Sequence, residues 1–117
     1  PLYRRKYENK DVNAGYVVAA EVAAGQLPTG GSFKAGAGRI SAAGTSMRIE
    51  QATANAIVHW DSFSIGRDGT VSFHNGAGAT LNRVTGGMGP SSINGVLSAN
   101  GRVFLVNPHA VEIAGQA

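Results

Sequence analysis

Short apolar blocks separated by turn-forming residues fill the chain from Leu27 to Val111. The blocks are rich in β-branched and aromatic residues, and Gly, Asn, Asp or Ser separates one block from the next. This part of the chain shows no apolar positions at helical spacing. These features predict an all-β domain whose strands are joined by tight turns. The blocks are 39–41, 47–49, 56–60, 70–73, 80–84 and 102–106.

Turn-forming residues indicate where the predicted strands end. Pro28 fixes a bend, and the glycines that follow Thr29 allow the chain to turn tightly there. Asp68-Gly69 predicts another turn, in which we expect Gly69 to adopt a positive φ. Further turns are predicted at 74–78, 86–90, 94–95 and 100–101.

Alternation along the strands identifies the side chains that we expect in the core. Residues two apart on a strand face the same way, so Val71 and Phe73 point into one interior, as do Val103 and Leu105. The expected core consists of Trp60, Phe63, Ile65, Val71, Phe73, Leu81, Val84, Val103, Leu105 and Val111.

The chain divides at about residue 26. Residues 1–26 form a predicted N-terminal arm, and residues 27–117 form the predicted β domain. Residues 1–11 are polar and charged, whereas residues 12–24 are rich in Ala and Val and are compatible with a short helix or a strand. A length of 117 residues predicts one domain, and 17 glycines favour a turn-rich fold over a helical one.

The net charge of +3 comes mainly from the N-terminal tip. Residues 1–11 carry four basic and two acidic side chains, whereas the rest of the chain carries six basic and five acidic ones. Nucleic-acid-binding proteins carry a basic stripe on a folded face, so we expect no nucleic-acid partner. No apolar run approaches the length of about 20 residues that spans a bilayer, so we expect no membrane insertion.

The chain contains no cysteine. Small secreted domains often supplement their core with disulfides, so a secreted domain of this kind needs another source of rigidity. A long ladder of backbone hydrogen bonds is one such source. The absence of cysteine also suits a chain that crosses a membrane pore unfolded, because a disulfide would lock a loop too wide to thread.

Residues with catalytic or metal-binding chemistry are few and scattered. His59, His74 and His109 lie in different predicted strands or turns, whereas a zinc site needs three or four converging ligands. Ser62, His59 and Asp61 supply the residue types of a catalytic triad, but neighbours along a strand face opposite sides. The sequence therefore predicts no enzymatic activity, no metal and no cofactor.

Several segments occur in an order and spacing that match one known domain. They are Leu27-Pro28-Thr29-Gly30-Gly31, Arg39-Ile40, Met47-Arg48-Ile49, 56–66, 70–73, 81–86 and 97–108. Together they resemble the N-terminal secretion domain of two-partner secretion exoproteins, the filamentous-haemagglutinin family. The resemblance spans about residues 27–115.

The resemblance implies a right-handed parallel β-helix, or β-solenoid, at the start of a long secreted adhesin, haemolysin or toxin of Gram-negative bacteria. It implies passage through the periplasm to the cell surface or medium. The periplasmic modules of an outer-membrane β-barrel transporter would recognise the domain, and its folding outside the cell would seed the rest of the β-helix.

Two pairs of residues match the short motifs of this family. Asn82 and Arg83 match the first motif, and Asn107 and Pro108 match the second. The resemblance makes these four residues candidates for recognition by the transporter. The alternative is that they only shape turns, and the two roles are compatible because a transporter can read a turn.

The second motif departs from the family pattern, which usually reads Asn-Pro-Asn-Gly. Here the sequence is Asn107-Pro108-His109-Ala110. Glycine adopts positive φ at the least cost, so Ala110 predicts either a different turn or a strained one. Domains of the family also continue well beyond this length, so the chain corresponds to the first part of one.

A second function follows if the end of the β-helix is left open. Unpaired strand edges invite pairing with another chain, and head-to-tail contacts that do not close produce a filament. The alternative hypothesis is therefore an extracellular fibre subunit that stacks end to end on copies of itself. Residues 1–26 would then be able to add a strand to a neighbour.

Overall fold

The computed structural model describes residues 22–87 and 89–114. Within these ranges the regular secondary structure consists of β-strands, and there is no helix. The prediction of an all-β domain is therefore confirmed for them. Most of the predicted N-terminal arm, including residues 12–21, lies outside the described residues. The strands are β1 (Ser32–Ala35), β2 (Gly38–Ala43), β3 (Ser46–Gln51), β4 (Asn55–Trp60), β5 (Thr70–His74), β6 (Ala79–Val84), β7 (Ser91–Ile93), β8 (Val96–Ala99), β9 (Arg102–Val106) and β10 (Val111–Ile113).

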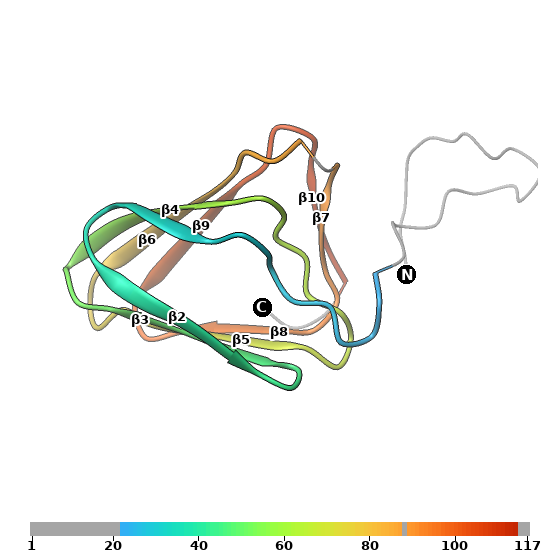
Figure 1. Cartoon of the computed structure of the whole chain (residues 1–117), viewed down its shortest axis with the longest axis horizontal. Coiled ribbons are helices and arrows are strands. Elements are labelled where there is room, and N and C mark those ends of the chain that lie inside the picture. Colours follow the sequence, from blue (N-terminus) through green and yellow to red (C-terminus); the bar gives the residue numbers. More distant parts are fainter. Residues whose placement is uncertain (1–21, 88, 115–117) are drawn as a thin grey trace, which may run out of the picture.

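The strands form three sheets that lie along the three sides of a triangle (Figure 1). The β4 sheet has the order β1-β4-β6-β9, and the β3 sheet has the order β2-β3-β5-β8. The third, the β7 sheet, consists of β7 and β10. The side chains that point inward from these sheets meet in one core.

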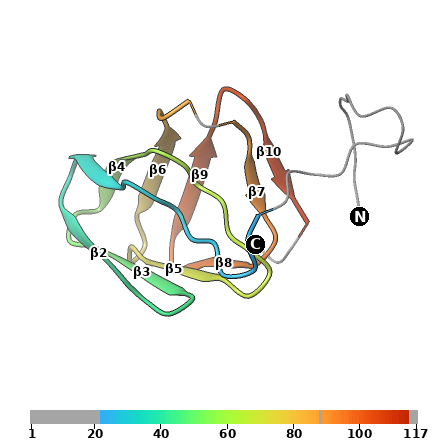
Figure 2. The same cartoon turned by 45° about the vertical axis from the view of Figure 1, so that its right-hand side comes forward.

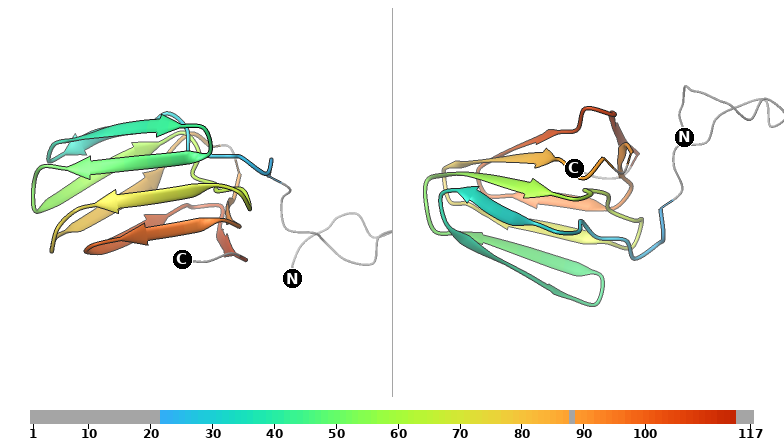
Figure 3. Two further views of the ribbon diagram at one scale, coloured as in Figure 1. Left: turned by 90° about the horizontal axis from the view of Figure 1, so that it is seen from below. Right: turned by 45° about the horizontal axis from the view of Figure 1, so that its top comes forward.

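The chain passes through the three sheets in the same order three times, and we call each pass a circuit. The first circuit runs through β3 and β4 to Ile65, which bridges to Ile93 of β7. The second contains β5, β6 and β7, and the third contains β8, β9 and β10. Figure 3 shows these circuits stacked as layers, with β2 at one end and β8 and β9 at the other.

Parallel pairing holds successive circuits in register. Ser46 of β3 pairs with Thr70 of β5, which pairs in turn with Val96 of β8. Equivalent positions in this sheet are therefore 24 and then 26 residues apart. Such long crossovers are required because parallel neighbours cannot be joined by a tight hairpin.

The first two strands run the other way. β1 pairs antiparallel with β4, and β2 pairs antiparallel with β3, from Gly38 opposite Gln51 to Ala43 opposite Ser46. The sequence indicated a parallel arrangement from residue 27 onward, so this part of the expectation is wrong. A tight turn at Gly44, with φ of 59°, joins β2 to β3 and imposes the antiparallel direction.

The buried core agrees with the expected one except at Leu81. Six expected residues are buried, namely Trp60, Phe63, Ile65, Val71, Phe73 and Val84, and Val103, Leu105 and Val111 are partly buried against them. Leu81 instead faces outward and is half-buried, because Val84 faces inward and places Thr80 and Asn82 on its own side of β6. Met47, Ile49, Val58 and Ile93 complete the core.

Glycines let successive circuits approach closely at the corners. A Cβ added at Gly78 would overlap the carbonyl oxygen of Ala54 in the circuit before it. One added at Gly31 would collide with the ring of Trp60, which explains the double glycine after Thr29. The turn at Asp68-Gly69 is present, but Gly69 is not among the residues with positive φ, so that expectation is wrong.

Candidate functional site

The two candidate motifs lie on neighbouring strands at the same end of the β4 sheet. Asn82 and Arg83 belong to β6, and Asn107 follows the last residue of β9. Because Arg83 pairs with Val106 in the parallel register, Asn107 begins the turn one position beyond Arg83. The structure therefore brings together two segments that are far apart in the sequence. Figure 2 shows β6 and β9 side by side.

Asn82 is a fully buried residue that connects three strands. Its Oδ1 accepts a 2.8 Å hydrogen bond from Nε1 of Trp60 in β4, and its Nδ2 donates to the carbonyl oxygen of Phe104 in β9 at 3.2 Å. The side chain thus joins all three circuits through the interior. A buried amide is stable only when its donors and acceptors have partners, and here both ends are engaged.

Asn107 organises the turn that follows β9. Its Oδ1 accepts a 2.9 Å hydrogen bond from the backbone N–H of His109, and the N–H of Ala110 donates to its carbonyl oxygen at 3.2 Å. Its Nδ2 donates to the carbonyl oxygen of Gly89 and to Oγ of Ser91, both at 3.0 Å. One amide therefore shapes the turn in the third circuit and ties it to the second circuit.

Ala110 ends this turn with a backbone φ of 139°. Among the described residues it is the one non-glycine residue with positive φ. Of the two alternatives expected for this position, a different turn or a strained one, the backbone of Ala110 agrees with the strained one. The N–H of Ser91 donates to the carbonyl oxygen of Ala110 at 3.0 Å, so the strained residue also contacts the preceding circuit.

The other two motif residues project outward. Arg83 is exposed on the outer face of the β4 sheet, where the register places it between His59 of β4 and Val106 of β9. Pro108 is exposed at the second position of the turn, where proline's fixed φ is favourable. The four candidates thus separate into two asparagines with internal bonds and two side chains accessible to a partner.

A buried polar cluster that the sequence analysis did not identify lies at the corner between the β3 and β4 sheets. Nδ2 of Asn75 donates to Oγ1 of Thr80 at 3.1 Å and to the carbonyl oxygen of Arg102 at 3.0 Å, and its Oδ1 accepts from Gly101 N–H at 2.7 Å. Thr80 in turn bonds Oε1 of Gln51. Alternation along β6 could have revealed Thr80, because it lies on the same inward face as Val84.

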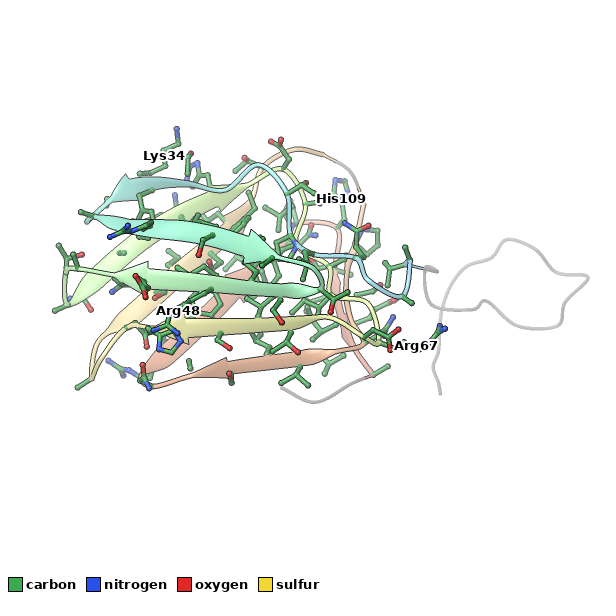
Figure 4. All side chains as sticks on the ribbon, turned by 60° about the horizontal axis from the view of Figure 1, so that its bottom comes forward. Lys34, Arg48, Arg67 and His109 are labelled. Atoms are coloured by element: carbon green, nitrogen blue, oxygen red, sulfur yellow. The ribbon has the colours of Figure 1, made fainter. Side chains whose placement is uncertain are left out.

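The residues that the sequence offered as metal ligands do not converge in the part of the chain that the structure describes. No group of three or more His, Cys, Asp or Glu residues there has the geometry to hold a metal ion. His109 projects from the turn after β9, well away from the β3 sheet that carries Arg48 (Figure 4). Within the same ranges, no helix long and apolar enough to cross a membrane is found.

One ion pair lies on the exposed face of the β3 sheet. Nε of Arg48 donates to Oε2 of Glu50 at 2.6 Å. This hydrogen bond and the charge of Arg48 lower the pKa of the Glu50 carboxyl below its ordinary value. Both side chains are solvated, so the pair contributes little to stability.

A scan against protein-family models matches residues 22–117 to the family described as the TPS secretion domain. Among solved structures, the secretion domain of HMW1 from Haemophilus influenzae superimposes with a TM-score of 0.68 at 31% sequence identity. This match covers 74% of the present chain and 23% of the HMW1 chain.

Two curated relatives are both named heme/hemopexin-binding protein and come from Haemophilus influenzae. The protein from strain Rd is 40% identical over 100 residues, which cover 84% of this chain and 11% of the relative. The other is 44% identical over 69 residues, which cover 57% of this chain and 7% of the relative. The chain therefore corresponds to a small part of each of these proteins.

Proposed function

This chain belongs to the TPS secretion-domain family. We propose that it is the secretion signal through which a two-partner secretion exoprotein is recognised. Its partner is an outer-membrane β-barrel transporter, whose periplasmic modules bind the domain before export. The family match over residues 22–117 carries this proposal. Two-partner secretion delivers the exoprotein from the periplasm of a Gram-negative bacterium to the exterior.

We propose that the three circuits are the start of a right-handed parallel β-helix. The support is that β3, β5 and β8 stack in parallel register, as do β4, β6 and β9. Crossover connections between parallel strands are almost always right-handed. The antiparallel strands β1 and β2 cover the first circuit and give the β-helix a defined beginning.

The second part of the proposed role is to seed folding once the chain has emerged. Asn82, Asn75 and Asn107 each bond groups in a neighbouring circuit, so each circuit offers specific partners to the one that follows. A template of this kind favours ordered growth over random strand pairing. Recognition and templating are not catalytic activities, and we accordingly propose that the domain is not an enzyme and needs no metal or cofactor.

Binding to the transporter's periplasmic modules tests the recognition role directly. The chain is immobilised, and the purified modules of the cognate transporter are passed over it, with the modules of an outer-membrane insertase as the control. We expect saturable binding of the cognate modules alone. Equal binding of both preparations, or of neither, would contradict the proposal.

Cellular export gives a second readout. The chain is expressed behind a periplasmic export signal, with and without the cognate transporter. We expect it in the medium when the transporter is present and in the periplasm when it is absent. The complete exoprotein's own activity, including a role as an adhesin at the cell surface, stays a proposal, because the chain matches 11% and 7% of its curated relatives.

End-to-end self-association is a second candidate function. It is favoured by β8, β9 and β10, which are each the last strand of a sheet in the described structure. Open edges of this kind are able to pair with β1 and β2 of another copy, which are the opposite edge strands of the β4 and β3 sheets. Sedimentation velocity over a wide concentration range tests this function, and a monomer at the highest concentration would exclude it.

A further inference from the structure

Glycine directly follows three asparagines of the chain, Asn75, Asn94 and Asn100. An Asn-Gly link is a favoured site of spontaneous deamidation, because glycine has no side chain to hinder attack by its backbone nitrogen on the asparagine side chain. All three links lie in turns between strands. Their hydrogen bonds differ, and so does their expected reactivity.

Deamidation of an Asn-Gly link needs no reactant besides water. The glycine nitrogen attacks Cγ of the asparagine and forms a C–N bond, its proton passes to Nδ2, and Nδ2 leaves as ammonia. Water then opens the cyclic succinimide at one of its two carbonyl carbons, which gives aspartate or isoaspartate. Hydrogen bonds that hold the glycine N–H or the asparagine amide therefore protect a link.

Asn75 is protected by its own hydrogen bonds. Its side chain is buried, and Nδ2 donates to Oγ1 of Thr80 at 3.1 Å and to the carbonyl oxygen of Arg102 at 3.0 Å. Nδ2 cannot leave as ammonia until both bonds are broken. The Asn75-Gly76 link is therefore expected to react slowly in the folded chain.

The same side chain protects the link that follows Asn100. Asn100 is exposed, so water reaches its amide freely. The attacking nitrogen of this link belongs to Gly101, whose N–H donates to Oδ1 of Asn75 at 2.7 Å. Attack must first break this hydrogen bond, so one buried amide protects two of the three links.

Neither kind of protection is present at Asn94, which lies between β7 and β8 at the corner where the β7 and β3 sheets meet (Figure 1). The Asn94 side chain is partly exposed. Among the hydrogen bonds of residues 22–87 and 89–114, none involves this side chain or the N–H of Gly95. Gly95 is itself buried close to the carbonyl oxygen of Gly66, so we expect slower reaction than in an unfolded chain.

We propose that Asn94 is a site of spontaneous deamidation in the folded chain and that Asn75 protects the other two Asn-Gly links. This inference is independent of the proposed function. Either product adds a carboxylate, which lowers the formal net charge of +3 by one.

The isoaspartate product also lengthens the backbone between two hydrogen bonds that join neighbouring segments. The Asn94 N–H donates to the carbonyl oxygen of Ile65 at 2.8 Å, and the Val96 N–H donates to that of Gly69 at 3.0 Å. An additional methylene between these donors prevents both bonds from keeping their geometry. The domain should therefore lose stability as isoaspartate accumulates.

Peptide mapping by mass spectrometry tests the proposed site. The chain is incubated at mildly alkaline pH, folded or unfolded in guanidinium chloride. We expect all three links to deamidate in the unfolded chain. In the folded chain Asn94 should react at least about tenfold faster than Asn75 or Asn100, because attack at those two must first break hydrogen bonds. A methyltransferase specific for isoaspartate provides an independent label, which Asn94→Ser should remove from the folded chain.

Variants of Asn75 test the protecting role. Asn75→Ala removes the acceptor of the Gly101 N–H and should raise the rate at Asn100 about tenfold without changing the rate at Asn94. Asn75→Asp keeps an acceptor oxygen and should leave Asn100 protected. Amide hydrogen exchange tests the unmodified chain without any substitution, and the Gly95 N–H should exchange faster than the Gly101 N–H.

The possible outcomes are distinguishable. If Asn94 stays intact in the folded chain while the unfolded chain deamidates, the proposed site is refuted. Equal rates at Asn94 and Asn100 in the folded chain, or equal exchange of the two glycine N–H groups, would refute the protection. If Asn75→Ala raises the rates at Asn94 and Asn100 together, that variant is unfolded, and the hydrogen-exchange comparison decides.

Discussion

The indole Nε1 of Trp60 donates a 2.8 Å hydrogen bond to Oδ1 of Asn82, and both side chains are buried in the core. The other end of the same amide donates to the carbonyl oxygen of Phe104. A single polar side chain therefore links the three circuits through their shared interior. A motif residue that the family resemblance identified as a candidate for recognition has a structural role that is visible from its bonds alone.

Replacing Asn82 with alanine should destabilise the chain by about 2–3 kcal/mol. The variant leaves the Trp60 indole N–H and the Phe104 carbonyl without their buried partner, and each such group costs about 1–3 kcal/mol. Urea unfolding followed by Trp60 fluorescence measures the change. Asn55→Ala, at an exposed position of the neighbouring strand, is the matched control, with an expected effect within about 0.5 kcal/mol. Equal losses in the two variants would show that the buried amide has no special role.

Replacing Ala110 with glycine should stabilise the chain by about 1 kcal/mol. Ala110 has a φ of 139°, which is unfavourable for any residue with a Cβ. Thermal unfolding measures the gain. The control is Ala99→Gly in strand β8, which removes a side chain from ordinary extended backbone and should cost about 0.5–1 kcal/mol. A loss of stability in both variants would mean that the turn is not strained.

The close contact at Gly78 should make alanine intolerable there. A Cβ at this position would overlap the carbonyl oxygen of Ala54, so the first two circuits would have to separate, at an expected cost of about 3 kcal/mol. Gly76→Ala is the control, because Gly76 has a positive φ of 59° and open space around it. Its cost should be limited to the backbone penalty of about 1–2 kcal/mol. Chemical denaturation compares the two, and an equal effect would contradict the packing argument.

Removing Arg48 should raise the pKa of the Glu50 carboxyl toward its ordinary value. The hydrogen bond from Arg48 is the main cause of the lowered pKa, and Arg39 has a smaller effect. The ion pair therefore favours the folded state above the ordinary pKa of a glutamate, and this contribution disappears as the pH falls through the lowered value. An NMR titration of Glu50 measures the change. Arg39→Ala should produce a smaller rise than Arg48→Ala, and the reverse order would refute this assignment.

Strand β6 shows where prediction from the local hydrophobic pattern fails. The sequence contains Leu81 and Val84 in one strand, and both were expected in the core, although residues three apart on a strand face opposite sides. The structure places Val84 inward and, with it, Thr80 and Asn82. Polar residues are acceptable inside because Trp60, Gln51 and Asn75 lie within hydrogen-bonding reach. Trp60 is 22 residues from Asn82 and Gln51 is 29 residues from Thr80, so hydrophobicity along one strand could not identify these partners.

The candidate site was located in part from the sequence. The motif pairs Asn82-Arg83 and Asn107-Pro108 were recognised from the sequence. A different or a strained turn was expected at Ala110, because glycine is the residue suited to positive φ. The sequence did not reveal that the two pairs are neighbours. Their proximity arises because β6 and β9 pair in parallel, with Arg83 opposite Val106.

The sequence by itself determined the six longest of the ten described strands and most of the turns, because β-branched residues, alternation and glycine act over a few neighbouring positions. It did not identify the short strands β1, β7, β8 and β10 among its apolar blocks. It also determined most of the core, including Trp60 and Phe73. Only the tertiary structure decided which strands are neighbours and that β1 and β2 run antiparallel. The parallel neighbours in the β3 and β4 sheets depend on contacts between residues more than 20 positions apart, and their register is set by the stacking of whole circuits rather than by any local preference.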